Sequence, residues 1–103
     1  MTKQLISGIY RLYDAHGDSF VGFSRNVDGT RKRLMFELKL NACSYKPLQD
    51  FYNKSGGLTF ELLEEYTPNG VEDDIVLDAQ LHARMYKWCE RLGERTVRIQ
   101  QSE

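Results

Sequence analysis

The chain of 103 residues is poor in cysteine, has no long apolar run and carries almost no net charge. Its two cysteines, Cys43 and Cys89, are too few for a disulfide framework, so we expect both to be reduced and the protein to be cytoplasmic. No apolar run approaches the roughly 20 residues that cross a bilayer, and the first ten residues lack the apolar core of a signal peptide. The net charge of −1 excludes a generally basic surface, so nucleic-acid binding would require a local cluster of positive charge.

What the sequence does contain is typical of one globular domain, expected over residues 1–103 with a core over about residues 7–92. Hydrophobic residues make up 41% and charged residues 28% of the chain, and neither an internal repeat nor a low-complexity linker interrupts it. β-branched and aromatic residues predict strands over 8–14 and 19–24, joined by a turn at Gly17. Alternating apolar residues predict a third strand over 58–66, and 96–100 is an optional short edge strand in addition to these three.

Three helices are predicted from capping residues and apolar periodicity. The first follows the candidate N-caps Asn26, Asp28 and Thr30, and the second begins at Pro47 and ends at the glycine pair 56–57. The third runs from about residue 72 to residue 92, since apolar residues recur there at steps of three or four. The order β-β-α-α-β-α predicts an α+β fold, α/β in the broad sense, in which a small, mainly antiparallel three-stranded sheet is flanked by about three helices.

Five short motifs stand in a fixed order along the chain. They are Gly8-Ile9-Tyr10; Phe20-Val21-Gly22; Ser24 with Asn26 and Val27; Leu48-Gln49-Asp50-Phe51 with Asn53 and Gly56; and Phe60-Glu61-Leu62-Leu63-Glu64. Together they resemble the GIY-YIG nuclease superfamily, particularly its small stand-alone bacterial and phage members. The resemblance implies a GIY-YIG-like fold and, in an intact member, endonuclease activity that depends on a divalent metal.

The departures from the family pattern fall on the residues that carry its chemistry. Phe20 replaces a tyrosine that helps to activate or orient the attacking water, and it has no hydroxyl. Thr30 stands where the family has an arginine, and Leu34 where it often has a histidine. The metal-binding glutamate of the last helix is replaced, depending on the alignment, by Gln80, Leu81, His82, Ala83 or Met85. Because one such group commonly contributes about 10²- to 10⁴-fold in rate, the resemblance implies a degenerate site.

The candidate site combines residues at family positions with residues that could bind an anion. The expected ligand- or phosphate-binding residues are Tyr10, Phe20, Gly22, Asn26, Arg31, Arg33 and His82. Tyr10 is either the surviving catalytic tyrosine or a hairpin aromatic, and Phe20 is most simply a packing residue. Arg31 and Arg33 either cradle a phosphate at the start of a helix or belong to a solvated basic face.

His82 has two interpretations. One turn after Asp78, it is either a proton carrier oriented by that carboxylate or a packing residue beside the apolar stripe. We expect no metal ligands, because neither the cysteines nor the histidines have the spacing of a zinc site.

Three functions are left open by the sequence. The favoured one is a module that binds nucleic acid or a small phosphorylated ligand, with weak or no phosphodiesterase activity and no expected cofactor. The second is an active DNA endonuclease with a rearranged site that uses Mg²⁺ or Mn²⁺. The third is a protein-interaction module that uses the sheet edge or the Phe36 side of the first helix. No membrane partner is expected, and the protein is a monomer or a homodimer.

Overall fold

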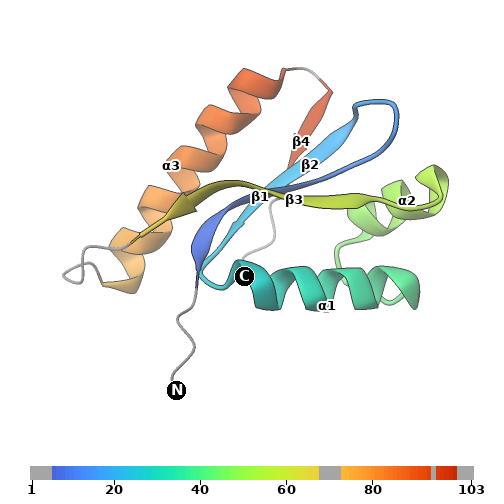
Figure 1. The fold of residues 1–103 in the computed structure, drawn as a ribbon, viewed down its shortest axis with the longest axis horizontal. Helices are drawn as coiled ribbons and strands as arrows, with labels where there is room; N and C mark the ends of the chain where they lie inside the picture. Colours follow the sequence, from blue (N-terminus) through green and yellow to red (C-terminus); the bar gives the residue numbers. More distant parts are fainter. Residues whose placement is uncertain (1–5, 68–72, 94, 100–103) are drawn as a thin grey trace.

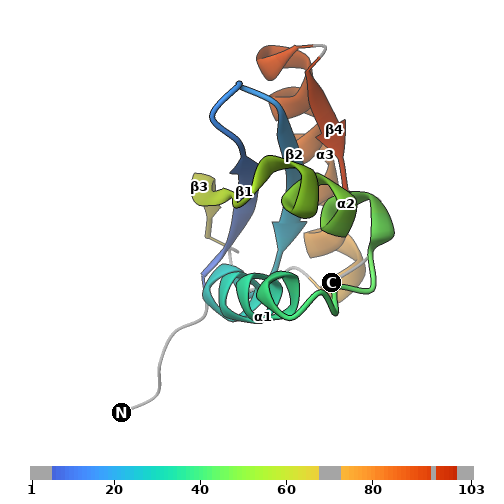
Figure 2. The same ribbon diagram turned by 90° about the vertical axis from the view of Figure 1, so that its right-hand side faces the viewer.

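The computed structural model describes residues 6–67, 73–93 and 95–99. Its strands are β1 (Ser7–Tyr13), β2 (Ser19–Ser24), β3 (Thr59–Tyr66) and β4 (Thr96–Arg98), and its helices are α1 (Val27–Lys39), α2 (Lys46–Ser55) and α3 (Asp74–Leu92). The strands form one sheet in the order β3-β1-β2-β4. Helices α1 and α2 lie on one face of this sheet, and α3 lies on the other (Figures 1 and 2).

The predicted α+β class is confirmed, but the prediction of a three-stranded sheet is wrong, because β4 joins the sheet described here as a fourth strand. β4 pairs parallel with β2, with Val21 opposite Arg98, and the Ile99 N–H donates to the Val21 carbonyl at 2.8 Å. Since β1 is antiparallel to both β2 and β3, the strands β2, β3 and β4 run in one direction. A parallel connection needs a long crossover, and α3 supplies it between β3 and β4. Residues 72 and 100, predicted in the last helix and the last strand, lie outside the described residues.

The turn between β1 and β2 forms as the sequence predicts. The Asp14 carboxylate accepts hydrogen bonds from the backbone N–H groups of His16 at 3.0 Å and Asp18 at 2.9 Å. Gly17 has a φ of +93°, which favours glycine. Burial acts to raise the pKa of the Asp14 carboxyl, but the N–H donors of Asp18 and His16 outweigh it and hold the pKa below its usual 3.8.

The helix ends follow from capping residues. Asn26, one of the predicted caps, precedes α1 and accepts a hydrogen bond from the Gly29 N–H at 3.1 Å. Pro47 lies in the first turn of α2, and Gly56, at a φ of +75°, ends that helix. Asp73 caps α3. Among the described helices, none is both long and apolar enough to cross a membrane.

Two apolar layers enclose the sheet. The layer under α1 and α2 contains the buried residues Tyr10, Leu12, Phe20, Val27, Leu34, Leu38, Cys43, Leu48 and Ile99. The layer under α3 contains Ile9, Val21, Leu81 and Met85, with Leu77, Trp88 and Leu92 packed against them. The predicted apolar stripe of the last helix is therefore confirmed. Since β-strand side chains alternate, Gly22 and Ser24 face α1 while Val21 and Phe23 face α3.

One buried polar side chain fixes the connection between α1 and α2. Gln49 accepts a hydrogen bond from the Cys43 N–H at 3.0 Å and donates to the Leu38 carbonyl at 3.2 Å and to the Asn53 side chain at 3.0 Å. Leu48 beside it is 1% exposed. The match of these two residues to a family motif is therefore accounted for by folding.

Candidate functional site

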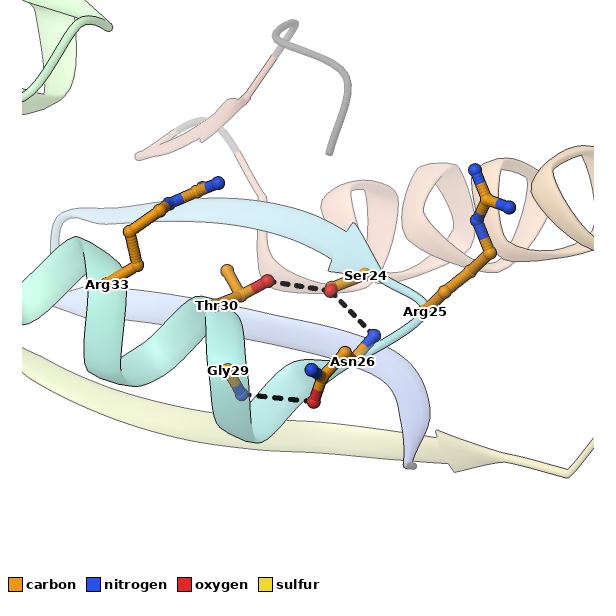
Figure 3. A pocket seen from close by; sticks show the side chains of 6 residues that line it. All are labelled: Ser24, Arg25, Asn26, Gly29, Thr30 and Arg33. Atoms are coloured by element: carbon orange, nitrogen blue, oxygen red, sulfur yellow. Dashed lines mark hydrogen bonds between the residues drawn. The ribbon is translucent and has the colours of Figure 1, made fainter. Parts of the chain in front are cut away.

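An open pocket of about 410 Å³ lies where β2 ends and α1 begins (Figure 3). Its lining residues are Ser24, Arg25, Asn26, Gly29, Thr30 and Arg33. Two of them, Asn26 and Arg33, belong to the predicted site. The pocket therefore lies at the N-terminal end of a helix, where unpaired backbone N–H groups and the helix dipole favour an anion.

Short polar contacts hold this strand-to-helix junction in one conformation (Figure 3). The buried hydroxyls of Ser24 and Thr30 lie 2.7 Å apart, and the Ser24 oxygen also accepts from the Asn26 N–H at 2.9 Å. Gly29 packs so closely on the Asn26 amide that a Cβ at position 29 would lie 2.5 Å from its nitrogen. The floor of the pocket is thus fixed by residues whose own hydrogen bonds are made within the junction.

Two arginines provide the positive charge of the pocket. The Arg25 guanidinium reaches toward α3, where its nitrogens lie 3.2 Å from an oxygen of Asp74 and 3.2 Å from an oxygen of Asp78 (Figure 3). Arg33 stands on α1 one turn after Gly29, on the pocket side of the helix. None of the six lining residues carries a carboxylate. The lining therefore favours a negatively charged ligand.

Tyr10 lies in the core beneath this pocket rather than in its wall. Its side chain is fully buried and stacks on Phe60, with ring centroids 4.9 Å apart. A Cβ at Gly22 would lie 2.7 Å from the Tyr10 hydroxyl oxygen and 3.2 Å from Ile99 Cδ1. The phenol therefore packs against the backbone of Gly22, next to the residue that follows β4, and this contact alone requires glycine at position 22.

Phe20 occupies an aromatic cluster between the sheet and α2. Its ring stacks on Phe51 at a centroid distance of 5.0 Å and meets the Tyr45 ring edge-on at 6.3 Å. The side chain is 7% exposed. Phe20 and Tyr10 share a face of the sheet with the pocket residue Ser24, but both serve as core residues here.

The structure separates the remaining predicted residues from the pocket. Arg31 donates to Asp28 at 2.8 Å and lines another, apolar hollow of about 230 Å³ beside Phe60. His82 lies on α3, across the sheet from Tyr10, where it contacts Phe23 and Tyr86. Arg31 and Arg33 point apart because two residues of a helix turn a side chain by about 200°.

Four further residues line the pocket although the sequence does not predict a ligand-binding role for them: Ser24, Arg25, Gly29 and Thr30. One signal for Arg25 was present. It stands immediately before the N-cap residue Asn26, and a side chain at that place lies beside the positive end of the helix.

A divalent metal, which the resemblance to the nuclease superfamily implies, does not fit the side chains gathered here. Mg²⁺ prefers oxygen ligands that include a carboxylate, whereas this pocket offers hydroxyl and amide oxygens beside two guanidinium groups. The carboxylates that Arg25 reaches on α3, those of Asp74 and Asp78, are paired with its guanidinium. Across residues 6–67, 73–93 and 95–99, no three His, Cys, Asp or Glu side chains lie close enough together to hold a metal ion.

Among the comparisons with known proteins, only the comparison with solved structures gives a match. No protein-family model matches it, and no curated protein matches it by sequence. Among solved structures, it resembles the catalytic domain of the homing endonuclease I-TevI at 24% identity and a TM-score of 0.65, over 92% of this chain and 99% of that one. A glutamate-to-alanine variant of the catalytic domain of the intron endonuclease I-TevI matches at 26% identity and a TM-score of 0.60, over 85% and 84% of the two chains. The chain therefore has the fold of the catalytic domain of a GIY-YIG homing endonuclease, which confirms the resemblance drawn from its motifs.

Proposed function

We propose that this protein binds a phosphate group of a nucleic acid or nucleotide in the pocket at the start of α1, and that it hydrolyses phosphodiesters weakly or not at all. One observation carries the proposal. The pocket is lined by Arg25 and Arg33, by neutral polar side chains and by no carboxylate. The nuclease-like fold supports nucleic acid as the source of the phosphate.

The pocket contributes to phosphate binding in two ways. Arg33 projects from the first turns of α1 and can form charge-assisted hydrogen bonds with phosphate oxygens. The N-terminal end of α1 adds the favourable potential of a helix dipole, worth about 0.3 to 1 kcal/mol at an exposed site. Arg25 also pairs with two aspartates of α3, whereas Arg33 belongs to α1 itself, so the substitution of Arg33 is the more direct test of the pocket.

The proposed loss of turnover follows from the two positions that would prepare a water molecule for attack. Phe20 has no hydroxyl and is surrounded by aromatic rings. Tyr10 keeps its hydroxyl but is fully buried against Gly22. With neither group available to a substrate in the pocket, the residues that remain favour binding over hydrolysis.

The test is a titration of the wild type, of Arg33→Ala and of the matched control Arg31→Ala with inorganic pyrophosphate and a panel of mononucleotides. Ligand binding to the folded state raises the melting temperature. We expect a shift in the wild type and in Arg31→Ala, whose side chain faces a different hollow, and a loss of about tenfold or more in affinity in Arg33→Ala.

Two results would contradict the proposal. One is the absence of any shift in melting temperature with every anion, and the other is an equal loss of affinity in the two arginine variants.

Incubation of the wild type with single-stranded, duplex and branched DNA in Mg²⁺ or Mn²⁺ tests the proposed weak or absent hydrolysis. Cleavage that scales with enzyme concentration would favour the alternative of an active endonuclease.

A further inference from the structure

We propose that a row of side chains along the seam between α3 and the β2–β4 part of the sheet stacks the bases of a single-stranded nucleic acid whose phosphate enters the α1 pocket. The row consists of Phe23, His82, Tyr86 and Arg98, and we call it the stacking row. This inference rests on the proposed function and deepens it, because it names an extended single strand, rather than a free nucleotide, as the ligand.

The stacking row is built from successive contacts between α3 and the strands. The Phe23 and His82 rings have centroids 5.8 Å apart, and the His82 and Tyr86 rings have centroids 4.7 Å apart. The Arg98 guanidinium lies 4.2 Å above the Tyr86 ring. Three rings and one cation therefore form an unbroken contact chain from β2 across α3 to β4.

The contacts of the row repeat regularly because two residues of β2 rise by nearly the same distance as four residues of α3. Two residues of a strand rise about 6.8 Å, and four residues of a helix rise about 6 Å. Arg25 accordingly contacts Asp78, Phe23 contacts His82 one turn on, and the next turn brings Tyr86 to Arg98, which pairs with Val21. The seam thus presents one interaction for each helical turn.

The row opens to solvent and carries positive charge. His82 and Tyr86 are exposed, Tyr86 to 41%. Within the described part of the chain, no carboxylate pairs with Arg98. On the other side of α3, Arg11 and Arg84 also lie over tyrosine rings, but Glu61 and Glu64 neutralise them. The stacking row therefore differs from these two places in keeping its positive charge.

Arg25 connects this row with the proposed phosphate pocket. It lines the pocket, and it also forms the first contact of the seam through Asp78. A ligand that contacts the pocket and also the far end of the row, at Tyr86 and Arg98, crosses two helical turns of α3, so we expect it to be longer than one nucleotide. Its bases must also be free to stack on side chains, which is a property of single strands and not of a duplex interior. The net charge of −1 likewise disfavours a long duplex, whose binding depends on neutralising many phosphates.

Two aspartates limit the affinity of this surface. Asp74 and Asp78 flank Arg25, and the Asp74 side chain is 83% exposed. They repel a passing phosphate and, together with Arg25, leave one net negative charge at this end of the seam. Asp74→Asn should accordingly tighten binding of a single strand by about two- to fivefold at low salt, with the gain fading as ionic strength rises.

The experiment measures fluorescence anisotropy of a labelled oligothymidylate of about ten nucleotides, of the same strand in a duplex, and of labelled thymidine monophosphate. The variants are His82→Ala, Tyr86→Ala and Tyr86→Phe, with Phe36→Ala as the matched control because that ring is 65% exposed on α1. Arg98→Ala is compared with Arg91→Ala, since both guanidinium groups lie over a ring. Melting temperatures establish that each variant is folded.

We expect His82→Ala and Tyr86→Ala to weaken single-strand binding by about 5- to 150-fold, the range for loss of one stacked base. Tyr86→Phe and Phe36→Ala should leave it unchanged, and none of these variants should alter the binding of the monophosphate. Arg33→Ala should weaken the binding of both the single strand and the monophosphate.

The outcomes separate this inference from the proposed function. Monophosphate or pyrophosphate binding without tighter binding of the oligonucleotide overturns the stacking row and leaves the pocket in place. Single-strand binding that is insensitive to His82→Ala and Tyr86→Ala also overturns it, as does equal affinity for the duplex. Failure of every phosphate ligand to bind overturns the proposed function, and the stacking row with it.

Discussion

The two faces of the sheet differ in what their aromatic residues do. On the α1 and α2 face, Tyr10 and Phe20 are enclosed in the core, against Gly22 and Phe51. On the α3 face, Tyr86 is exposed under a guanidinium group. Tyr10 and Phe20, the aromatic residues of the two triplets, are therefore interior residues, while the α3 face presents an aromatic and a basic group to solvent.

The comparison indicates which parts of the family pattern survive. Gly22 and Gln49 match the family, and each has a packing or hydrogen-bonding reason to be present in this fold. Phe20 and Thr30 depart from the family, and each is satisfied locally, Phe20 by rings and Thr30 by the Ser24 hydroxyl. At these four positions, the residues that match the family pattern have a role in folding, and the residues that depart from it are satisfied by their local contacts.

The largest expected loss of stability comes from a substitution on the α1 and α2 face of the sheet. Gly22→Ala would place a Cβ 2.7 Å from the Tyr10 hydroxyl and 2.9 Å from Tyr10 Cζ, and should lower the free energy of unfolding by about 1 to 3 kcal/mol. Urea unfolding measures the loss. In a Tyr10→Phe background the same substitution should cost less, because the hydroxyl contact is gone. Equal costs in both backgrounds would show that the hydroxyl does not contribute to the requirement for glycine.

The next effect concerns the α3 face, where a polar contact holds the helix to the sheet. The Glu64 carboxylate accepts from Arg84 at 2.5 Å and from the Trp88 indole N–H at 2.9 Å. Glu64→Gln should reduce the free energy of unfolding by about 1 to 2 kcal/mol, since it replaces a charged acceptor at a half-buried site. The neighbouring exposed Glu65→Gln should change it little. Similar losses in the two variants would contradict the role given to Glu64.

A tyrosine at position 20 tests whether that residue serves packing or chemistry. Phe20→Tyr places an oxygen among the rings of Phe51 and Tyr45, so we expect a loss of stability of about 1 kcal/mol. Because Tyr10 is still buried in that variant, no gain of DNA cleavage is expected with Mg²⁺ or Mn²⁺. Appearance of metal-dependent cleavage in Phe20→Tyr alone would show that a single hydroxyl separates this chain from an active nuclease.

The smallest effect belongs to the turn that both faces share. The folded-state pKa of Asp14 lies below its usual 3.8, so its contribution to stability is present above the unfolded-state pKa and is lost as pH falls through the folded-state pKa. Asp14→Asn should therefore be less stable than the wild type at neutral pH. The difference in their free energies of unfolding should be smaller at about pH 3. Urea unfolding at both pH values measures this difference, which a pH-independent gap would contradict.

Most elements could be predicted because their signals are local. The strand at 19–24 has the predicted bounds, and the stripe from Leu77 to Leu92 faces the sheet as its spacing requires. The parallel pairing of β4 could not be predicted, because three residues carry little signal and their partner in β2 is distant in sequence. Enclosure of Tyr10 depends on the same distant segment through Ile99.

The candidate site could be predicted only in part, because it too depends on contacts between segments that are distant in the sequence. Asn26 was identified by its capping chemistry and Arg33 by its place in a basic cluster. Whether Arg31 or Arg33 faces the pocket depends on the rotation of α1, which apolar spacing left open. The orientation of the Arg25 side chain could not be predicted, because it depends on Asp74 and Asp78 of α3, which are distant in the sequence.

The addition of β4 also bears on how the sheet ends. β4 covers the edge of β2, so within the described residues β3 provides the long free edge. That strand is interrupted by an irregularity between its pairing partners Ile9 and Tyr10, and it carries Glu61, Glu64 and Glu65. A kink and repeated negative charge are the features by which natural sheets resist fibril growth from an edge. Substitution of those glutamates by apolar residues would remove the charged part of that protection.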